Sequence, residues 1–331
     1  MRVLTDNNIS VDAWTSFIEG NVHATPFQSP SYLHFFNSVG GFSAKSYAVD
    51  DDGLVKALAV VTVQGEKGPA GLFSRRQIVY GGPLADDNCP DALDMLLKAI
   101  DEDTPGGVIY TEIRNLSDFS ALSDVFLRNG YEYVPYLNFR VDTSSRESMA
   151  GRVSSSRSRQ IRKAQQQSVI CSEAQNENEV RQFYLLLKEL YGKKLHKPLP
   201  PGDFFIQFYG QDLGKYLLVR HEEQIIGGIM CPVLPGRALY EFYICGRDDV
   251  KAGLYPGVMA TWSAMEYAAG NNIPLFDFMG AGRPDEQYGV RDFKARFGGE
   301  LVEYGRYLKI RKPLLYKTGK AALQFMKNKG K

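Results

Sequence analysis

One stretch near the C-terminus, FDFMGAGRPDEQYGVRDFKARFGG at residues 276–299, constrains the fold more than any other part of the chain. An apolar strand is expected at 275–279. The turn after it contains Gly280 and Gly282, which let the backbone approach a ligand or another segment closely. A helix is predicted from Pro284, because a proline and two acids suit a first helical turn and apolar residues then recur three or four positions apart. The stretch therefore predicts a strand–turn–helix unit of an α/β domain.

This predicted helix also places polar side chains beside the glycine turn. Arg291 and Lys294 are three positions apart and so are neighbours on the helix surface. Two adjacent cations next to such a turn indicate an anion site. Arg283 and Arg291 are candidate clamps for phosphate or carboxylate, and Tyr288 is a candidate hydrogen-bond partner of a substrate. The alternative is a solvated surface position for the cations and a packed position for the tyrosine.

The remaining sequence predicts two similar α/β modules that meet near residue 145. The expected helices cover residues 11–20, 30–38, 90–100, 117–129, 177–191 and 256–269. The expected strands cover residues 45–49, 54–63, 77–80, 108–114, 131–142, 216–220, 225–233, 237–245, 275–279 and 301–310. We therefore expect mixed sheets with helices (α/β, α+β) in two domains, residues 1–145 and 146–331, the second with a basic C-terminal tail.

Several classes of protein are disfavoured by what the sequence lacks. A chain of 331 residues suits two soluble domains. No apolar segment approaches the roughly 20 residues that span a bilayer, and no signal-peptide pattern is evident, so we expect a cytoplasmic protein. The four cysteines are scattered and are read as reduced core residues. The four histidines have no metal-ligand spacing, and no phosphate-loop or serine-nucleophile motif is present.

Charge is distributed unevenly along the chain. The net charge is +1, but residues 1–150 hold 11 cations and 20 acids, whereas residues 151–331 hold 28 cations and 18 acids. Part of the excess lies at 151–170, where Arg159 and Lys163 are four apart and share a helix face with Arg157 and Arg162 nearby. We interpret this segment as a phosphate-binding face. The alternatives are a solvated face and the contact of a basic with an acidic domain.

One acid stands out because its neighbours are aromatic. Glu241 lies between Tyr240 and Phe242 in a predicted strand. If it is buried, its pKa is raised, and it is a candidate base or paired carboxylate that contacts the substrate. The alternative is an outward position on an alternating strand.

The 276–299 stretch resembles the C-terminal signature of the Fem-type aminoacyl transferases, members of the GNAT-like acyltransferase superfamily. The matching residues are Gly280, Gly282, Tyr288-Gly289-Val290, Phe293-Lys294, Phe297-Gly298-Gly299 and Tyr304. Three further segments resemble the family in the same order along the chain: PFQSPSYLHFF (26–36), IVYGGPLA (78–85) and SSSRSRQIRKAQQQSV (154–169).

The resemblance implies two tandem GNAT-like domains and the transfer of an amino acid from aminoacyl-tRNA to an amine of a peptidoglycan or other cell-envelope precursor. It implies that Lys294 is catalytic, near the aminoacyl end of the tRNA, and that no cofactor is needed besides the donor. Such a transfer requires that the two partners are held in attack geometry and that the oxyanion is stabilised.

Two departures from the family keep alternatives open. The lysine that cell-wall members often carry after the QSP segment is replaced by Phe35, Phe36 and Asn37, which weakens the case for a muropeptide acceptor. The KAGLYPG loop (251–257) has glycines but not the spacing of a CoA-binding loop. The alternatives are an acyl-CoA-dependent N-acyltransferase acting on an amino sugar and a degenerate binder of RNA or of an envelope precursor. A basic amphipathic helix at 318–329 is a candidate contact with an anionic membrane surface.

Overall fold

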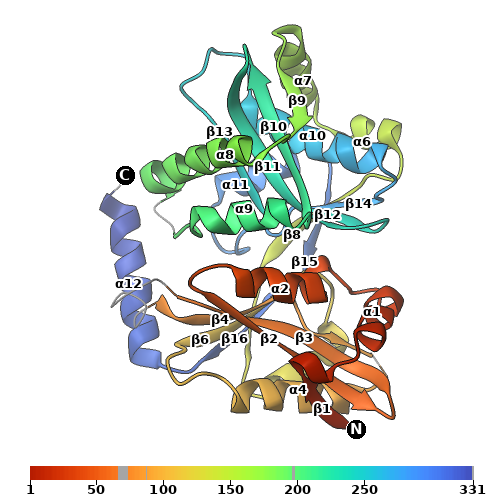
Figure 1. Ribbon diagram of the computed structural model, residues 1–331. Helices are drawn as coiled ribbons and strands as arrows, with labels where there is room; N and C mark the ends of the chain where they lie inside the picture. Colours follow the sequence, from red (N-terminus) through yellow and green to blue (C-terminus); the bar gives the residue numbers. More distant parts are fainter. Residues whose placement is uncertain (66–73, 87, 196–197, 330–331) are drawn as a thin grey trace. The chain divides into compact units, whose positions relative to one another are not determined.

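The computed structural model describes residues 1–65, 74–86, 88–195 and 198–329. Its contacts divide the chain into two compact units (Figure 1). Unit 1 consists of Met1–Tyr136 and Glu303–Asn328, and unit 2 is built on Leu137–Val302. No helix in the described part of the chain is long and apolar enough to cross a bilayer.

Unit 1 is a mixed sheet with helices on both faces. Its strands are β1 (Arg2–Thr5), β2 (Phe42–Asp51), β3 (Leu54–Gln64), β4 (Arg76–Gly81), β5 (Leu84–Ala85), β6 (Tyr110–Asn115), β7 (Glu132–Val134) and β16 (Arg306–Ile310). Its helices are α1 (Val11–Gly20), α2 (Pro30–Ser38), α4 (Pro90–Glu102), α5 (Ser123–Arg128) and α12 (Pro313–Lys329). The strand order is β1-β2-β3-β4-β6-β16-β7, and β5 pairs with β3.

Both faces of the unit 1 sheet are covered by apolar side chains. Aliphatic residues of α4, such as Leu93 and Leu97, pack with Val49 and Val61 on one face. Helix α2 lies across the opposite face (Figure 1), where Phe36 stacks on Tyr80 of β4. This two-sided burial explains why β3 is continuously apolar from Ala57 to Val61.

Unit 2 repeats the same arrangement of a mixed sheet between helices. Its strands are β8 (Leu137–Asp142), β9 (Ile170–Glu173), β10 (Gly214–His221), β11 (Gln224–Leu234), β12 (Ala238–Tyr240), β13 (Tyr243–Gly246), β14 (Leu275–Asp277) and β15 (Glu300–Glu303). Its helices are α6 (Arg146–Arg152), α7 (Ser155–Gln166), α8 (Glu177–Leu190), α9 (Gly202–Gly210), α10 (Pro256–Gly270) and α11 (Gly289–Ala295). The order is β15-β8-β14-β12-β11-β10-β9, and β13 pairs with β11.

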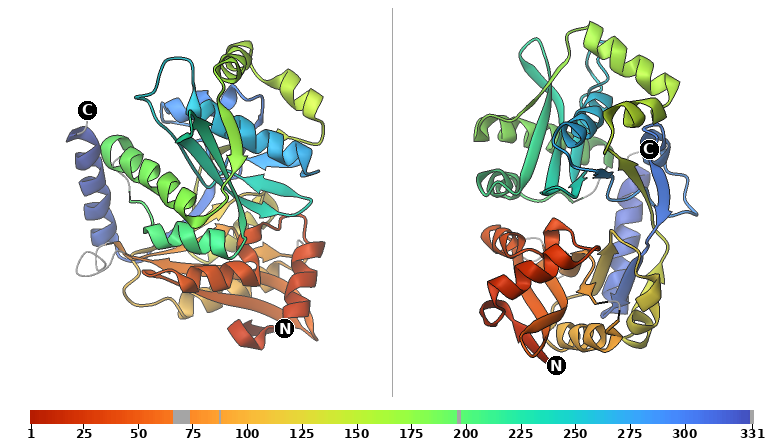
Figure 2. Two further views of the ribbon diagram at one scale, coloured as in Figure 1. Left: turned by 45° about the horizontal axis from the view of Figure 1, so that its top comes forward. Right: turned by 90° about the vertical axis from the view of Figure 1, so that its right-hand side faces the viewer.

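Successive side chains of β10 pack against helices on opposite faces of the unit 2 sheet. Leu217 and Val219 belong to the same apolar cluster as α10. Tyr216, on the other face, packs edge-on against Phe183 of α8 and Phe208 of α9. Figure 2 shows α10 on one side of these strands and α8 with α9 on the other. Successive side chains of a strand point to opposite faces, so one sequence segment serves both layers.

Several expected elements differ from the structure. The strand expected at 301–310 is two strands: β15 joins the sheet of unit 2, whereas β16 pairs with β6 and β7 in unit 1. Residues 303–328 thus belong to unit 1, not to the second domain in which the sequence analysis put them. A glycine, Gly305 at φ +62°, separates the two strands, and a positive φ suits glycine because it has no Cβ.

Other boundaries are shorter than expected. Helix α11 begins at Gly289, not at Pro284, since residues 284–286 form a turn in which Asp285 binds Arg283. The strand expected at 237–245 is interrupted at Glu241 and Phe242. Helix α12 contains the expected basic helix at 318–329; the side chains beyond Ala321, and residues 330–331, lie outside the described residues.

Candidate functional site

The candidate site lies where two parallel strands of unit 2 stop pairing. β12 and β14 are in register at Leu239 with Phe276 and at Tyr240 with Asp277. One further bond follows, from the Glu241 N–H to the Asp277 carbonyl at 2.8 Å. Beyond it, the Phe242 N–H donates to Met230 of β11. The carboxyl ends of parallel strands are where open α/β sheets commonly bind ligands.

Glu241 and Lys294 meet at this point as a buried ion pair. The Lys294 Nζ lies 2.7 Å from the Glu241 Oε1, and the two side chains are 9% and 4% exposed. Glu241 comes from the interruption between β12 and β13, and Lys294 comes from α11. The structure therefore brings together two residues that the sequence analysis selected separately.

The Lys294 ammonium is fully occupied. Besides Glu241, it donates to the Phe278 carbonyl and to the Gly280 carbonyl, both at 2.8 Å. An ammonium has three donors, and these bonds use all three. The lysine thus joins α11 to the turn after β14, and it holds Glu241 against that turn.

Glu241 has one unpaired oxygen. Its Oε2 is buried and has no hydrogen-bond partner among the described residues. Burial raises the pKa of Glu241, and Lys294 opposes this shift. A buried carboxylate with a raised pKa and an unpaired oxygen holds a proton more readily than an exposed one, as a general base requires.

The glycine turn between β14 and α11 is required by close contacts. Gly280 has φ +133° and Gly282 has φ +81°. A Cβ on Gly282 would lie 2.7 Å from the ring of Tyr288, so this tyrosine packs on the turn. Both glycines are therefore placed by backbone geometry, which the sequence analysis expected for a close approach.

The two arginines of this region bind protein atoms. Arg291 donates from Nε to the Ala281 carbonyl at 3.0 Å and also binds the Arg283 carbonyl. Arg283 forms a two-bond pair with Asp285 at 3.1 and 3.2 Å. In this conformation both arginines brace the turn, and their candidate role as phosphate clamps requires that these bonds be given up.

Helix α7 carries the predicted basic face, and its Arg157 packs against the α11 segment. Arg157 is buried, lies over the rings of Phe293 and Phe297 at 4.4 and 4.9 Å, and donates to the Phe293 carbonyl at 3.2 Å. Its expected place on the basic face is therefore wrong. Burial lowers the pKa of Arg157 to about 10. Three other cations of α7 remain exposed: Arg159, Arg162 and Lys163.

The four segments that carry the family resemblance form two contacting pairs. In unit 1, Gln28 of the 26–36 segment donates from Nε2 to the carbonyl of Gly82 in the 78–85 segment at 2.9 Å. In unit 2, Arg157 of the 154–169 segment lies against the aromatic rings of the signature helix. Each pair thus stabilises one unit.

Two residues of the site were not selected from the sequence. Asp277 at the end of β14 and Asn138 of β8 are both buried and are joined by a 2.8 Å hydrogen bond. Asp277 gave the same signal as Glu241, an acid within an apolar strand. Asn138 gave no signal of its own, because its partners lie far away in the sequence.

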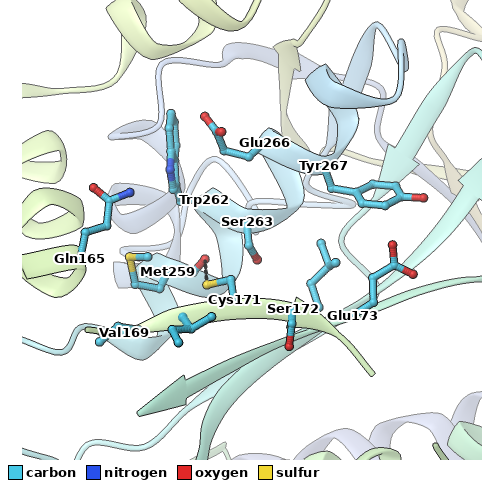
Figure 3. Close-up of a pocket in the computed structure, with 12 residues that line it drawn as sticks. Gln165, Val169, Cys171, Ser172, Glu173, Met259, Trp262, Ser263, Glu266 and Tyr267 are labelled. Atoms are coloured by element: carbon cyan, nitrogen blue, oxygen red, sulfur yellow. Dashed lines mark hydrogen bonds between the residues drawn. The ribbon is translucent and has the colours of Figure 1, made fainter. Parts of the chain in front are cut away.

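A separate pocket of about 550 Å³ opens between β9 and α10 (Figure 3). Its wall includes Trp262, Tyr267 and Cys171, and none of the candidate site residues named above lines it. Burial raises the pKa of the Cys171 thiol to about 11, which disfavours a nucleophilic thiolate. Within the described residues, no group of histidine, cysteine and acidic side chains is arranged to hold a metal ion.

Comparison with known proteins identifies the fold. Residues 152–294 match the model of the acetyltransferase (GNAT) domain. A search of curated proteins gives no match. A crystal structure of FemX is similar over 96% of this chain and 99% of that chain, with a TM-score of 0.72 at 13% identity.

Two other solved structures share the same architecture. L-PGS from Bacillus licheniformis is similar over 94% of this chain and 96% of that chain, with a TM-score of 0.58 at 14% identity. A tandem GNAT protein from the clavulanic acid biosynthesis pathway is similar over 93% and 98%, with a TM-score of 0.58 at 10% identity. The expected fold, two tandem GNAT-like domains, is confirmed.

Proposed function

We propose that this protein forms an amide bond by transferring an aminoacyl group from aminoacyl-tRNA to an amine of a cell-envelope precursor. The observation that carries the proposal is the buried Glu241–Lys294 pair at the point where β12 and β14 stop pairing, with the Glu241 Oε2 unused. The likeness to FemX over both units, and the Fem-type signature that contains Lys294, support the choice of an aminoacyl donor.

In this proposal the Glu241 Oε2 accepts a proton from the acceptor ammonium. The free amine then attacks the carbonyl carbon of the aminoacyl ester, a C–N bond forms and the ester C–O bond breaks. The ribose oxygen of the tRNA leaves and takes up the proton that the attacking nitrogen loses as it becomes an amide. A base whose pKa lies near the working pH is the most effective, and burial moves the pKa of Glu241 in that direction.

Lys294 has a different role from the one first expected. Its three donors are bound to Glu241 and to two carbonyls. We therefore assign it to positioning Glu241, and not to binding the oxyanion directly. The exposed cations of α7, Arg159, Arg162 and Lys163, are assigned to the phosphates of the tRNA.

The alternative donor is an acyl-CoA, which the match of residues 152–294 to an acetyltransferase domain favours. The residues before α10 do not fit its pyrophosphate. Pro256 at the first helical position has no N–H to donate. A Cβ on Gly253 would lie 2.4 Å from the Gln167 Nε2 and 2.7 Å from the Lys163 Cε, so side chains of the α7 segment cover this loop.

The test is transfer from two donors in parallel. The purified protein is incubated with tRNA charged with radiolabelled amino acids, or with radiolabelled acetyl-CoA. Each donor is offered nucleotide-linked muropeptides and amino sugars. We expect labelled amide product from aminoacyl-tRNA, and its loss in Glu241→Gln. Product from acetyl-CoA alone would assign the protein to CoA-dependent acylation. Binding of tRNA without product from either donor would contradict catalysis and indicate a binding protein.

A further inference from the structure

The Glu241–Lys294 pair is held in place by a second layer of buried polar groups on β8 and β14. The two carbonyls that accept from Lys294 belong to Phe278 and Gly280. Where the ammonium sits therefore depends on the conformation of the turn at 277–280. The groups that fix this turn fix the position of Glu241 as well.

The turn contains backbone geometry that needs support. Met279 has φ +55°, an uncommon value for a residue with a side chain. The Asp277 Oδ1 accepts from the Met279 N–H at 2.7 Å. Such conformations persist when surrounding contacts hold them and are often found at functional sites.

Asn138 holds the turn from the neighbouring strand. Its Nδ2 donates to the Asp277 Oδ1 at 2.8 Å. Its Oδ1 accepts from the Gly280 N–H at 2.7 Å and from the Phe139 N–H at 2.9 Å. Three of the four hydrogen bonds available to an asparagine side chain are therefore formed, and two of them reach the turn.

We propose that Asn138 is a positioning residue for the candidate base Glu241, acting through the 277–280 turn and the Lys294 ammonium. The proposal rests on the proposed function, since it assigns Asn138 to the same reaction. A chain of hydrogen bonds joins Asn138 to Gly280, Gly280 to Lys294, and Lys294 to Glu241. Asn138 itself touches none of the reacting atoms.

Charged groups near this series of hydrogen bonds shift the pKa values of Glu241 and Asp277. Lys294 lowers and Asp277 raises the pKa of Glu241. Burial raises the pKa of Asp277, while Asn138, Met279, Arg140 and Lys294 oppose the shift. Among the described residues, Glu241 raises the pKa of Tyr191 and Cys231, and Asp277 raises the pKa of Tyr240, each in addition to burial.

The first test is Asn138→Ala, measured by activity. We expect kcat to fall on the order of ten- to a hundred-fold, because a small misplacement of a reacting group has an effect of this size. KM for the donor should change less than twofold. The control is Asn129→Ala in unit 1, which removes a buried asparagine that donates to Asp94 and to the Val125 carbonyl. This control should lose stability and keep its kcat. An equal loss of kcat in both variants would overturn the proposal.

Asn138→Asp gives a second readout. An ionised carboxyl cannot donate to Asp277, but a protonated one can replace the amide donor. The ratio of variant to wild-type kcat should therefore rise as the pH falls from 8 to 5.5. A ratio independent of pH would contradict the role of the donor bond.

A third measurement does not depend on activity. Amide hydrogen exchange at Gly280 and Met279 should become at least tenfold faster in Asn138→Ala, and the carboxyl resonance of Glu241 should titrate at a changed pH. Unchanged exchange and titration would overturn the inference even if the reaction is the proposed one. Absence of transfer in the wild-type protein, with these two changes present, would contradict the proposed function and leave the mechanical coupling intact.

Discussion

Each unit contains a pair of parallel strands in its sheet, and the two pairs differ in how far their backbone pairing extends. In unit 1, β4 and β6 pair continuously from Gln77 with Thr111 to Gly81 with Asn115. In unit 2, β12 and β14 pair only at two positions before Glu241 interrupts the strand. A continuous ladder satisfies its own backbone groups. The interrupted one leaves the carbonyls of Phe278 and Gly280, and Lys294 binds them.

The acids beside these strands differ in the same sense. Glu112 on β6 lies between Arg114 at 2.7 Å and Arg306 at 2.8 Å, and these two cations lower its pKa to about 2 against the effect of burial. Glu241 has one cation, its pKa is raised, and one oxygen is unused. The first arrangement pairs both carboxylate oxygens of Glu112, whereas the second leaves one oxygen of Glu241 unpaired, as the proposed base requires. Burial of an acid therefore indicates function only when its partners leave one of its oxygens unpaired.

Removing each acid should have the largest and most unequal effects on activity. Glu241→Gln should lower kcat on the order of a hundred- to ten-thousand-fold, the range for loss of a general base. Glu112→Gln should leave kcat within about twofold, because Glu112 belongs to the ladder of the other unit. Single-turnover transfer assays on both variants, with circular dichroism to check folding, measure this. Equal losses would show that the two acids do not differ in role.

Removing the cation that pairs with the buried acid should lower the free energy of unfolding more for Lys294 in unit 2 than for Arg306 in unit 1. Lys294→Met leaves Glu241 buried without a partner, and breaking a buried ion pair in this way costs about 3–5 kcal/mol. Arg306→Met leaves Glu112 paired with Arg114 and should cost less. Urea unfolding measures both values. The double variant Glu241→Gln/Lys294→Met should recover part of the loss, and no recovery would contradict the ion pair as its cause.

The sequence predicts best those elements whose apolar residues and turn residues form a clear local pattern. The helices at 11–20 and 30–38 have the expected bounds, and the hairpin of β2 and β3 is confirmed. Boundaries that depend on distant partners were less predictable. β16 joins unit 1 through pairing with β6, which no local pattern encodes.

The site was predictable as residues but not as geometry. Glu241 and Lys294 each carried a local signal, an acid among aromatic residues and a cation beside a glycine turn. Their contact depends on the interruption of a strand, which local propensity does not reveal. The sequence analysis assigned Arg291 to a ligand, whereas in the structure it binds the Ala281 carbonyl. This carbonyl belongs to a turn whose conformation is defined only by the tertiary structure, so the sequence did not reveal the contact.

The acids should also give stability profiles of opposite sign with pH. The pKa of Glu112 is lowered from 4.5 to about 2, so its contribution is present above pH 4.5 and is lost as the pH falls toward 2. The pKa of Glu241 is raised from 4.5, so the folded state binds the proton more tightly, and stability falls as the pH rises above 4.5.

Replacement by glutamine should remove each effect. Glu112→Gln should reduce the loss of stability between pH 4.5 and 2, by on the order of 2–3 kcal/mol. Glu241→Gln should flatten the decline that begins above pH 4.5. Unfolding free energies measured by denaturant titration from pH 2 to 8 test both signs. If both substitutions changed the pH dependence of the unfolding free energy in the same direction, the opposite pKa shifts of the two acids would be contradicted.

The smallest expected effect is on tRNA binding by the exposed cations of α7 in unit 2. Arg159→Ala, Arg162→Ala and Lys163→Ala should each weaken tRNA binding a few-fold and lower the slope of log K against log salt by about one. Lys188→Ala is the matched control, because Lys188 is exposed on α8, which packs on the other face of the sheet from α10. Fluorescence anisotropy at several salt concentrations measures the slope. If α7 meets the tRNA backbone, the three α7 variants lose slope and the control keeps it, whereas the same loss in all four would assign the binding to diffuse charge.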